Sequence, residues 1–218
     1  MLLDWIYPPR CIACGMLFAP VHNKPRPWLC ESCRPLLTPA PCTPEYENLH
    51  AAFLYDETLR DMLHEIKFRN KRQTAEGLGH ILAESTEAES LPKADYIVPI
   101  PMHPAKKRAR GFNQAEIIAR PLSKKLNIPI ARDMLRRVKN TRPQAGLSGR
   151  SRRHNLEGAF SFNAKKYSRG VKSVLLLDDI FTSGATIGAC AGVLAENGIL
   201  DIYTISLSIA LSDKFTNL

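Results

Sequence analysis

A strand that runs into two carboxylates is the most informative stretch of the sequence. Residues 174–177 are all aliphatic, Asp178 and Asp179 follow directly, and the small residues 182–186 lead into a helical pattern. Backbone N–H groups at a helix N-terminus bind phosphate, and Gly184 would let the ligand approach the backbone closely. Two carboxylates at a strand end can accept hydrogen bonds from ribose hydroxyls or hold hydrated Mg²⁺. The stretch predicts a sugar-phosphate site; the alternative is an ordinary strand–turn–helix connection.

Four of the six cysteines form two C-x-x-C pairs, which is a metal-binding pattern. Cys11 and Cys14 are separated by fifteen residues from Cys30 and Cys33. This spacing is typical of a zinc ribbon, in which four thiolates surround one Zn²⁺. Four thiolates leave no open coordination position, so the predicted zinc is structural. The alternatives are four reduced thiols without a metal, or a redox-labile pair.

The positive charge of the chain is concentrated in one tract. The 218 residues include 30 Lys and Arg against 21 Asp and Glu, a net charge of +9. Residues 102–153 hold 15 basic and two acidic residues, a net +13, so the rest of the chain is net negative. Such a tract favours a polyanionic ligand, with a solvated surface as the alternative. Phe112 is its only aromatic residue, so we expect any contact with DNA to involve mainly the phosphate backbone.

Composition divides the chain into two parts. Residues 1–45 hold nine of the 16 prolines, and proline interrupts helices and central strands. A short segment of this kind needs a metal or another cross-link to fold. We therefore predict a zinc-ribbon module over residues 1–45 and a larger domain over residues 46–218.

Alternating strand and helix patterns must position these residues. The sequence predicts strands near 50–55, 96–98, 174–177 and 202–210, and helices near 59–66, 74–87, 113–126 and 187–194. Strands that alternate with helices form an α/β fold, with a mostly parallel sheet flanked by helices. Residues 138–155 are rich in Gly, Arg and Ser, and predict a long mobile loop of the kind that is usually functional.

Several motifs together resemble one family. LLLDDIFTSGAT (175–186) resembles the ribose-phosphate signature of type I phosphoribosyltransferases. VPIPMHPAKKRARGFNQAE (98–116) is similar to the segment after the second core strand in the ComF family, and Thr141-x-x-Gln144-x-x-Leu147 resembles the loop of that family. The four-cysteine module belongs to the same architecture. The resemblance covers most of the chain and departs at Ser183, where the signature often has a second threonine.

The resemblance implies a type I phosphoribosyltransferase fold that binds phosphoribosyl pyrophosphate together with Mg²⁺. Asp178 and Asp179 would contact the ribose hydroxyls and form the catalytic pair, and Met102 and His103 would lie at the pyrophosphate loop. The 5′-phosphate would contact Thr182, Ser183, Gly184, Ala185 and Thr186. A basic run would neutralise pyrophosphate or contact a nucleic-acid backbone: Lys106, Lys107, Arg108 and Arg110. For His103, acid–base chemistry and a purely structural turn are both open.

The resemblance also implies a role in DNA uptake, natural competence or the use of external DNA. The sequence does not mark an acceptor, so three alternatives stay open: a phosphoribosyltransferase, a non-catalytic competence factor that binds single-stranded DNA and uses the fold as a ligand sensor, and a zinc-ribbon adaptor for a helicase or another competence protein. The N-terminal MLLDWIYPPR lacks a basic leader, and no stretch approaches the ~20 apolar residues of a membrane span. We expect a cytoplasmic protein.

Overall fold

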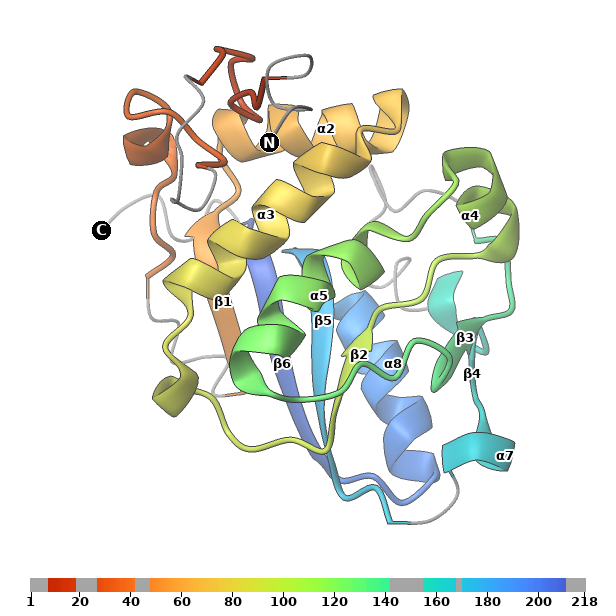
Figure 1. Cartoon of the computed structure of the whole chain (residues 1–218). Coiled ribbons are helices and arrows are strands. Elements are labelled where there is room, and N and C mark those ends of the chain that lie inside the picture. The colour runs from red at the N-terminus through yellow and green to blue at the C-terminus, as the bar shows by residue number, and fades with distance from the viewer. Residues whose placement is uncertain (1–7, 19–26, 42–47, 142–154, 168–169, 211–218) are drawn as a thin grey trace.

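A parallel sheet of four strands forms the centre of the molecule (Figure 1). The computed structural model describes residues 8–18, 27–41, 48–141, 155–167 and 170–210. The strand order is β1 (Leu49–Leu54), β6 (Asp201–Ile209), β5 (Ser173–Phe181) and β2 (Tyr96–Pro99), and every neighbouring pair is parallel. The carboxyl ends of the strands therefore meet at one edge of the sheet, where α/β folds bind ligands.

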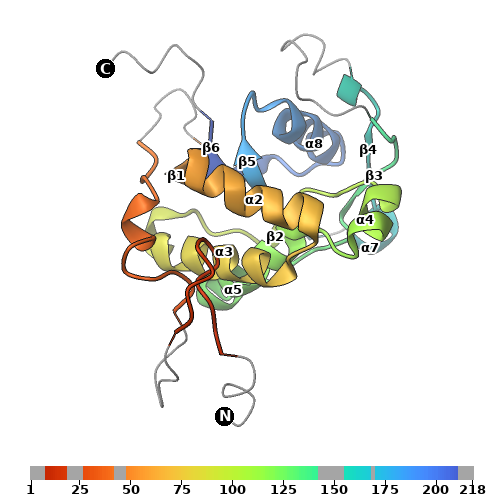
Figure 2. The ribbon, with the colours of Figure 1, turned by 90° about the horizontal axis from the view of Figure 1, so that it is seen from above.

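Helices cover both faces of the sheet. On one face α3 (Arg72–Ser85) packs on α5 (Gln114–Leu126), and on the other lies α8 (Ala185–Glu196). The first long helix, α2 (Glu57–Arg69), crosses above the carboxyl ends of the strands (Figures 1 and 2). The described residues also form four short helices: η1 (Arg34–Leu36), η3 (Ala88–Ser90), α4 (Pro104–Arg110) and α7 (Ala164–Tyr167). The predicted α/β fold, with a mostly parallel sheet flanked by helices, is confirmed.

Local sequence signals explain where the long helices begin. The Asp56 carboxylate accepts a hydrogen bond from the Leu59 amide at 3.0 Å and caps α2. Asn113 caps α5 in the same way, and its amide group also donates to the Ile100 carbonyl at 3.0 Å. The apolar stripe predicted for α2 is fully buried: Leu59, Met62, Leu63 and Ile66.

Two differences from the sequence-based expectation concern the strands. The strand expected over 174–177 continues to Phe181, so both aspartates lie within β5. A small antiparallel pair that the sequence did not predict, β3 (Leu135–Arg137) with β4 (Phe160–Phe162), stands beside the main sheet. The predicted mobile loop 138–155 connects these two strands, and its residues 142–154 lie outside the described part of the chain.

The cysteine-containing segment packs directly on the α/β domain. Trp28 and Ile12 contact α3 at Gly77, where a Cβ atom would lie 2.7 Å from Trp28 Cε3 and 2.8 Å from Ile12 Cδ1. The Trp28 ring also stacks on His80, with the ring centroids 5.1 Å apart. Buried cysteines of the segment belong to the same apolar cluster as α2, α3 and α5. The predicted domain boundary at 45/46 lies outside the described residues and stays a prediction.

A close approach of α3 to α5 gives a test of the helix packing. At Gly79 a Cβ atom would lie 2.8 Å from the Ile118 carbonyl oxygen and 2.9 Å from its Cα. Gly79→Ala is therefore expected to force the helices apart and to destabilise the protein by about 1–3 kcal/mol. Gly188→Ala in α8 is the matched control, because its Cβ meets nothing within 4 Å and alanine favours a helix by up to about 1 kcal/mol. Thermal unfolding measures the melting temperatures of both variants. Equal shifts in the two variants would contradict this close packing.

Candidate functional site

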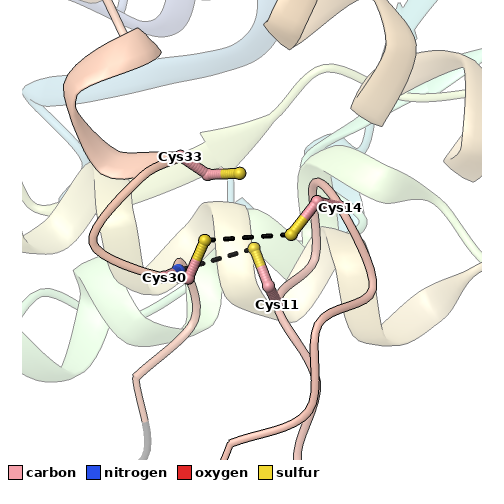
Figure 3. Close-up of side chains that lie close together, drawn as sticks. All are labelled: Cys11, Cys14, Cys30 and Cys33. Atoms are coloured by element: carbon pink, nitrogen blue, oxygen red, sulfur yellow. Dashed lines mark hydrogen bonds between the residues drawn. The ribbon is translucent and has the colours of Figure 1, made fainter.

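The four predicted zinc ligands converge on one point (Figure 3). The sulfur atoms of Cys11, Cys14, Cys30 and Cys33 all lie within 4.8 Å of one another, and those of Cys14 and Cys30 are 3.8 Å apart. Four sulfurs at about 2.3 Å from a tetrahedral Zn²⁺ would be separated by roughly 3.8 Å. The cluster thus fits one zinc ion, as the spacing predicted.

The surroundings of the four cysteine thiols favour a bound cation. Burial acts to raise the pKa of Cys11, but the N–H groups of Cys14, Cys30 and Ala13 outweigh it and lower the pKa to about 7. Burial and the neighbouring thiols raise the pKa of Cys33 well above its usual range. Four close thiols cannot all ionise without a positive partner, and a Zn²⁺ ion would supply that charge. The cysteines would bind the ion and fix the fold of the module.

A second site lies at the carboxyl edge of the sheet. Strand β2 ends at Pro99, opposite Leu177, whereas β5 continues to Phe181. Beyond the end of β2 a cavity of about 270 Å³ opens beside β5. Its lining combines two carboxylates with four cations and several neutral residues: Lys67, Ile100, Pro101, Met102, Lys106, Arg110, Asn113, Gln114, Ala115, Arg137, Asp178, Asp179 and Thr186.

The two aspartates reach this cavity from opposite faces of β5. Side chains alternate along a strand, so Asp179 continues the face of Leu177 toward α2 and α5, and Asp178 continues the face of Leu176 toward α8. Lys67 Nζ lies 3.4 Å from Asp179 Oδ2, and Gln114 Nε2 donates to the same oxygen at 3.1 Å. Arg110 in turn donates to Gln114 Oε1 at 2.6 Å. A linked polar network therefore holds Asp179.

The environment gives the two carboxyl groups different protonation behaviour. Burial and the adjacent Asp179 charge raise the pKa of Asp178 well above its ordinary value. Burial would also raise the pKa of Asp179, but Lys67 and the hydrogen bonds from Asp178 and Gln114 lower it. Asp179 is thus the more acidic of the two carboxyl groups.

One cation of the cavity, Lys67, pairs with Asp179, and the other three lie close enough to influence one another or the aspartates. Burial lowers the pKa of Lys106, and the charges of Arg137 and Arg110 lower it further. Burial also lowers the pKa of Arg110, against the effect of Asp179, and the pKa of Arg137, against the effects of Cys190 and Asp178. The half-buried Arg110 and Arg137 and the exposed Lys106 thus gather positive charge at the cavity, and a bound anion would offset it.

The structure brings some of the sequence-predicted residues to this cavity and leaves others outside it. Met102, Lys106, Arg110 and Thr186 line it together with the two aspartates. Ser183, Gly184 and Ala185 line a separate groove of about 550 Å³ along α8, and Thr182 is exposed. Gly184 is the N-cap residue of α8 and has a φ of +68°. Because glycine has no side chain, it offers no acceptor to the first amides of the helix.

The remaining predicted residues lie on or next to α4. His103 Nδ1 accepts a hydrogen bond from the Ala105 amide at 3.2 Å, which caps the helix. Lys107 Nζ pairs with Glu116 at 2.7 Å, and Arg108 is exposed. The basic run is thus divided, with Lys106 and Arg110 at the cavity and Lys107 and Arg108 outside it.

Sequence reasoning missed Lys67, Gln114 and Arg137 as site residues. Arg137 is half-buried on β3, between the exposed Arg136 and Val138, and its guanidinium lies 5.4 Å from the centre of the Phe160 ring. Its Nη2 also donates to Thr141 Oγ1. Side chains alternate between the two faces of a strand, so Arg137 shares the face of the apolar Leu135; this was the signal in the sequence that Arg137 faces inward. For Lys67 the sequence holds no comparable signal.

Replacing Lys67 with methionine is expected to raise the pKa of Asp179, because the neighbouring ammonium group is lost. A carboxyl group with a lowered folded-state pKa stabilises the fold above its unfolded pKa, and this contribution disappears as the pH falls through the folded value. The melting temperature of Lys67→Met should therefore depend less on pH than that of the wild type between about pH 5 and pH 3. Carbon NMR titration of Asp179 would measure the shift directly, with Lys107→Met as the control. An unchanged titration curve would contradict the ion pair.

Comparison with known proteins assigns the chain to a family. No protein-family model matches it. The chain is 32% identical to Competence protein F of Haemophilus influenzae over 173 residues, which are 77% of this chain and 75% of the relative. It is 30% identical to DNA utilization protein YhgH of Escherichia coli K12, covering 71% and 69% of the two chains, and 27% identical to Competence protein ComFC of Bacillus subtilis, covering 68% and 58%. Within the described residues, none of the helices has the length and apolarity that crossing a membrane requires. With these relatives, the cysteine cluster and the α/β fold, the chain is a member of the ComF family.

Proposed function

We propose that the cavity binds phosphoribosyl pyrophosphate with Mg²⁺ and that the protein acts in DNA uptake or the use of external DNA. One observation supports the ligand most directly: Lys106, Arg110 and Arg137 line the same small cavity as two carboxylates, at the carboxyl edge of a parallel sheet. Cations suit a pyrophosphate group, and the carboxylates suit ribose hydroxyls or a hydrated Mg²⁺.

Each part of the cavity would meet a different part of the ligand. Lys106, Arg110 and Arg137 would neutralise the pyrophosphate, and Asp178 with Asp179 would accept hydrogen bonds from the ribose. Mg²⁺ would add charge neutralisation at the phosphate oxygens. If transfer occurs, the bond between the anomeric carbon and the pyrophosphate oxygen breaks and a bond to the acceptor forms. The cations would then stabilise the charge that develops on the leaving pyrophosphate.

The role in DNA handling is inferred from the relatives and from the charge of the chain. Two of the relatives are named as competence proteins and one as a DNA utilization protein. The net charge of +9 favours a polyanionic partner, and Lys107 and Arg108 lie on the part of α4 that is outside the cavity. This surface supports a second candidate function: a competence factor that binds single-stranded DNA and uses the cavity as a ligand sensor without turnover.

Isothermal titration with phosphoribosyl pyrophosphate and Mg²⁺ tests the proposed ligand. We expect binding by the wild type and its loss in the Asp178→Ala/Asp179→Ala double variant. Titration with inorganic pyrophosphate separates a general anion site from one that also recognises ribose. Absence of binding by the wild type, or equal binding by the double variant, would overturn the assignment. Release of pyrophosphate in the presence of candidate bases and amines would distinguish a transferase from a sensor.

A further inference from the structure

The outer face of α2 carries a pair of rings that the cavity does not use. Phe68 is 70% exposed, and among the described Phe, Tyr and Trp residues it is the only one that is mainly solvent-exposed. Its ring centroid lies 4.2 Å from that of His64, with 33° between the planes. The two residues are four positions apart, so they share one face of the helix. The buried Ile66 lies on the opposite face.

The surroundings of this ring pair are charged rather than apolar. Between His64 and Arg72 the chain has one carboxylate, Glu65, and four cations: Lys67, Arg69, Lys71 and Arg72. Glu65 pairs with both Arg69, at 2.9 Å, and Lys71, at 2.5 Å. Arg72 pairs with Glu76 at 3.2 Å, and Lys67 pairs with Asp179. The four cations thus have three carboxylate partners, and Glu65 is shared by two of them.

The ring pair lies between two hollows of the surface. On one side Lys67 faces the anion cavity. On the other side a groove of about 960 Å³ runs between α2 and the cysteine module. Its walls hold the cations Arg10, Arg69, Lys71 and Arg72, the carboxylates Asp61 and Glu65, and three of the clustered cysteines. Residues on a helix are about 100° apart, so Lys67 and Arg69 flank the His64–Phe68 face from its two sides. A strand that crosses α2 would meet cations on both sides of the rings.

We propose that His64 and Phe68 form a stacking platform for an unpaired base of single-stranded DNA, with the phosphates of the strand lying in the groove beside Arg69 and Lys71. The proposal rests on the DNA-related part of the proposed function and names the surface that makes the contact. An exposed ring bordered by cations combines the two elements of single-strand binding, stacking and backbone attraction. A protein partner would instead favour an interface centre depleted of charge.

The mode of binding differs from the backbone-driven contact that the sequence alone suggested. That expectation came from residues 102–153, where Phe112 is the only aromatic residue, and Phe112 is buried. The platform on α2 lies outside that tract. A base within a duplex is already stacked on its neighbours and cannot cover the Phe68 ring, so the platform selects unpaired strands.

Fluorescence anisotropy with a labelled oligo(dT) 20-mer tests the platform in the full-length, zinc-loaded protein. Phe68→Ala is expected to weaken binding by about tenfold or more, since one stacked base contributes roughly 1–3 kcal/mol. An abasic oligonucleotide of the same length and charge should bind the wild type and Phe68→Ala equally. Phe68→Trp should restore affinity for oligo(dT), and its added indole fluorescence should be quenched on binding. Leu200→Ala, which removes another exposed apolar side chain directly before the start of β6, is the control.

The outcomes separate this proposal from the proposed function. Wild-type affinity of Phe68→Ala for oligo(dT), or an equal loss on the abasic strand, would overturn the stacking platform while leaving DNA binding intact. If the wild type does not bind oligo(dT), both the platform and direct DNA binding are overturned. Binding of phosphoribosyl pyrophosphate is measured separately and is unaffected by either result.

Discussion

Cys30→Ser is expected to abolish zinc binding and to lower the melting temperature by about 10 °C. The Cys30 side chain is buried, its sulfur lies 3.8 Å from that of Cys14, and its amide donates to Cys11 Sγ at 3.4 Å. A structural zinc contributes up to about 10–16 kcal/mol in isolated zinc fingers. If the loss of zinc lowers the free energy of unfolding of the whole chain by only about 3 kcal/mol, the melting temperature of a chain of this size falls by roughly 6–12 °C.

Metal analysis and thermal unfolding together check this result. The wild type should hold one zinc per chain and lose stability when a strong chelator is added, whereas Cys30→Ser should not respond to the chelator. Cys190→Ala is the matched control, because Cys190 lies on α8 and is buried in the other apolar cluster. It should lower stability but keep one zinc. A Cys30→Ser protein with a full zinc content would rule out the four-thiolate site.

Arg110→Gln is expected to weaken binding of phosphoribosyl pyrophosphate by about 100-fold. Arg110 lines the cavity, is half-buried, and is linked to Asp179 through Gln114. Removing one partner of a buried, hydrogen-bonded charge pair costs roughly 2–5 kcal/mol, and 2.8 kcal/mol corresponds to a factor of about 100. Glutamine keeps the polarity and much of the length of the side chain, so the measured loss reports the missing charge.

Arg108→Gln provides the control on the same helix. It makes the same change of charge two residues away, but Arg108 is exposed and does not line the cavity. Titration calorimetry should show an affinity within about twofold of the wild type, because an exposed charge interacts weakly through water. Equal losses in the two variants would mean that general electrostatic attraction, and not the cavity, governs binding.

The sequence predicts those elements whose stability depends on an apolar pattern. The stripe of α2 and the aliphatic run of β5 were recognisable because burial requires apolar side chains at fixed intervals. The helix α4 was missed, since its seven residues have no apolar stripe and it depends on Pro104 and the His103 cap. The β3–β4 pair was missed because three-residue strands are too short to show alternation.

The candidate site was predictable only where one continuous motif carries it. Asp178, Asp179 and the four cysteines were found from local spacing. Lys67 and Arg137 come from elements that lie more than 40 residues from the aspartates in the chain, and a single charged residue does not indicate which surface it faces. The division of the basic run between cavity and solvent also depends on how α4 is rotated, which only tertiary packing determines.

The contact between Gly77 of α3 and the side chains of Trp28 and Ile12 has a consequence for any shortened form of this protein. A fragment that begins after residue 45 would lack both side chains, and the stretch of α3 around Gly77 would become exposed to water. An uncovered patch of this kind promotes self-association. The fragment 46–218 is therefore expected to self-associate more than the whole chain, so ligand studies are better made on the whole chain.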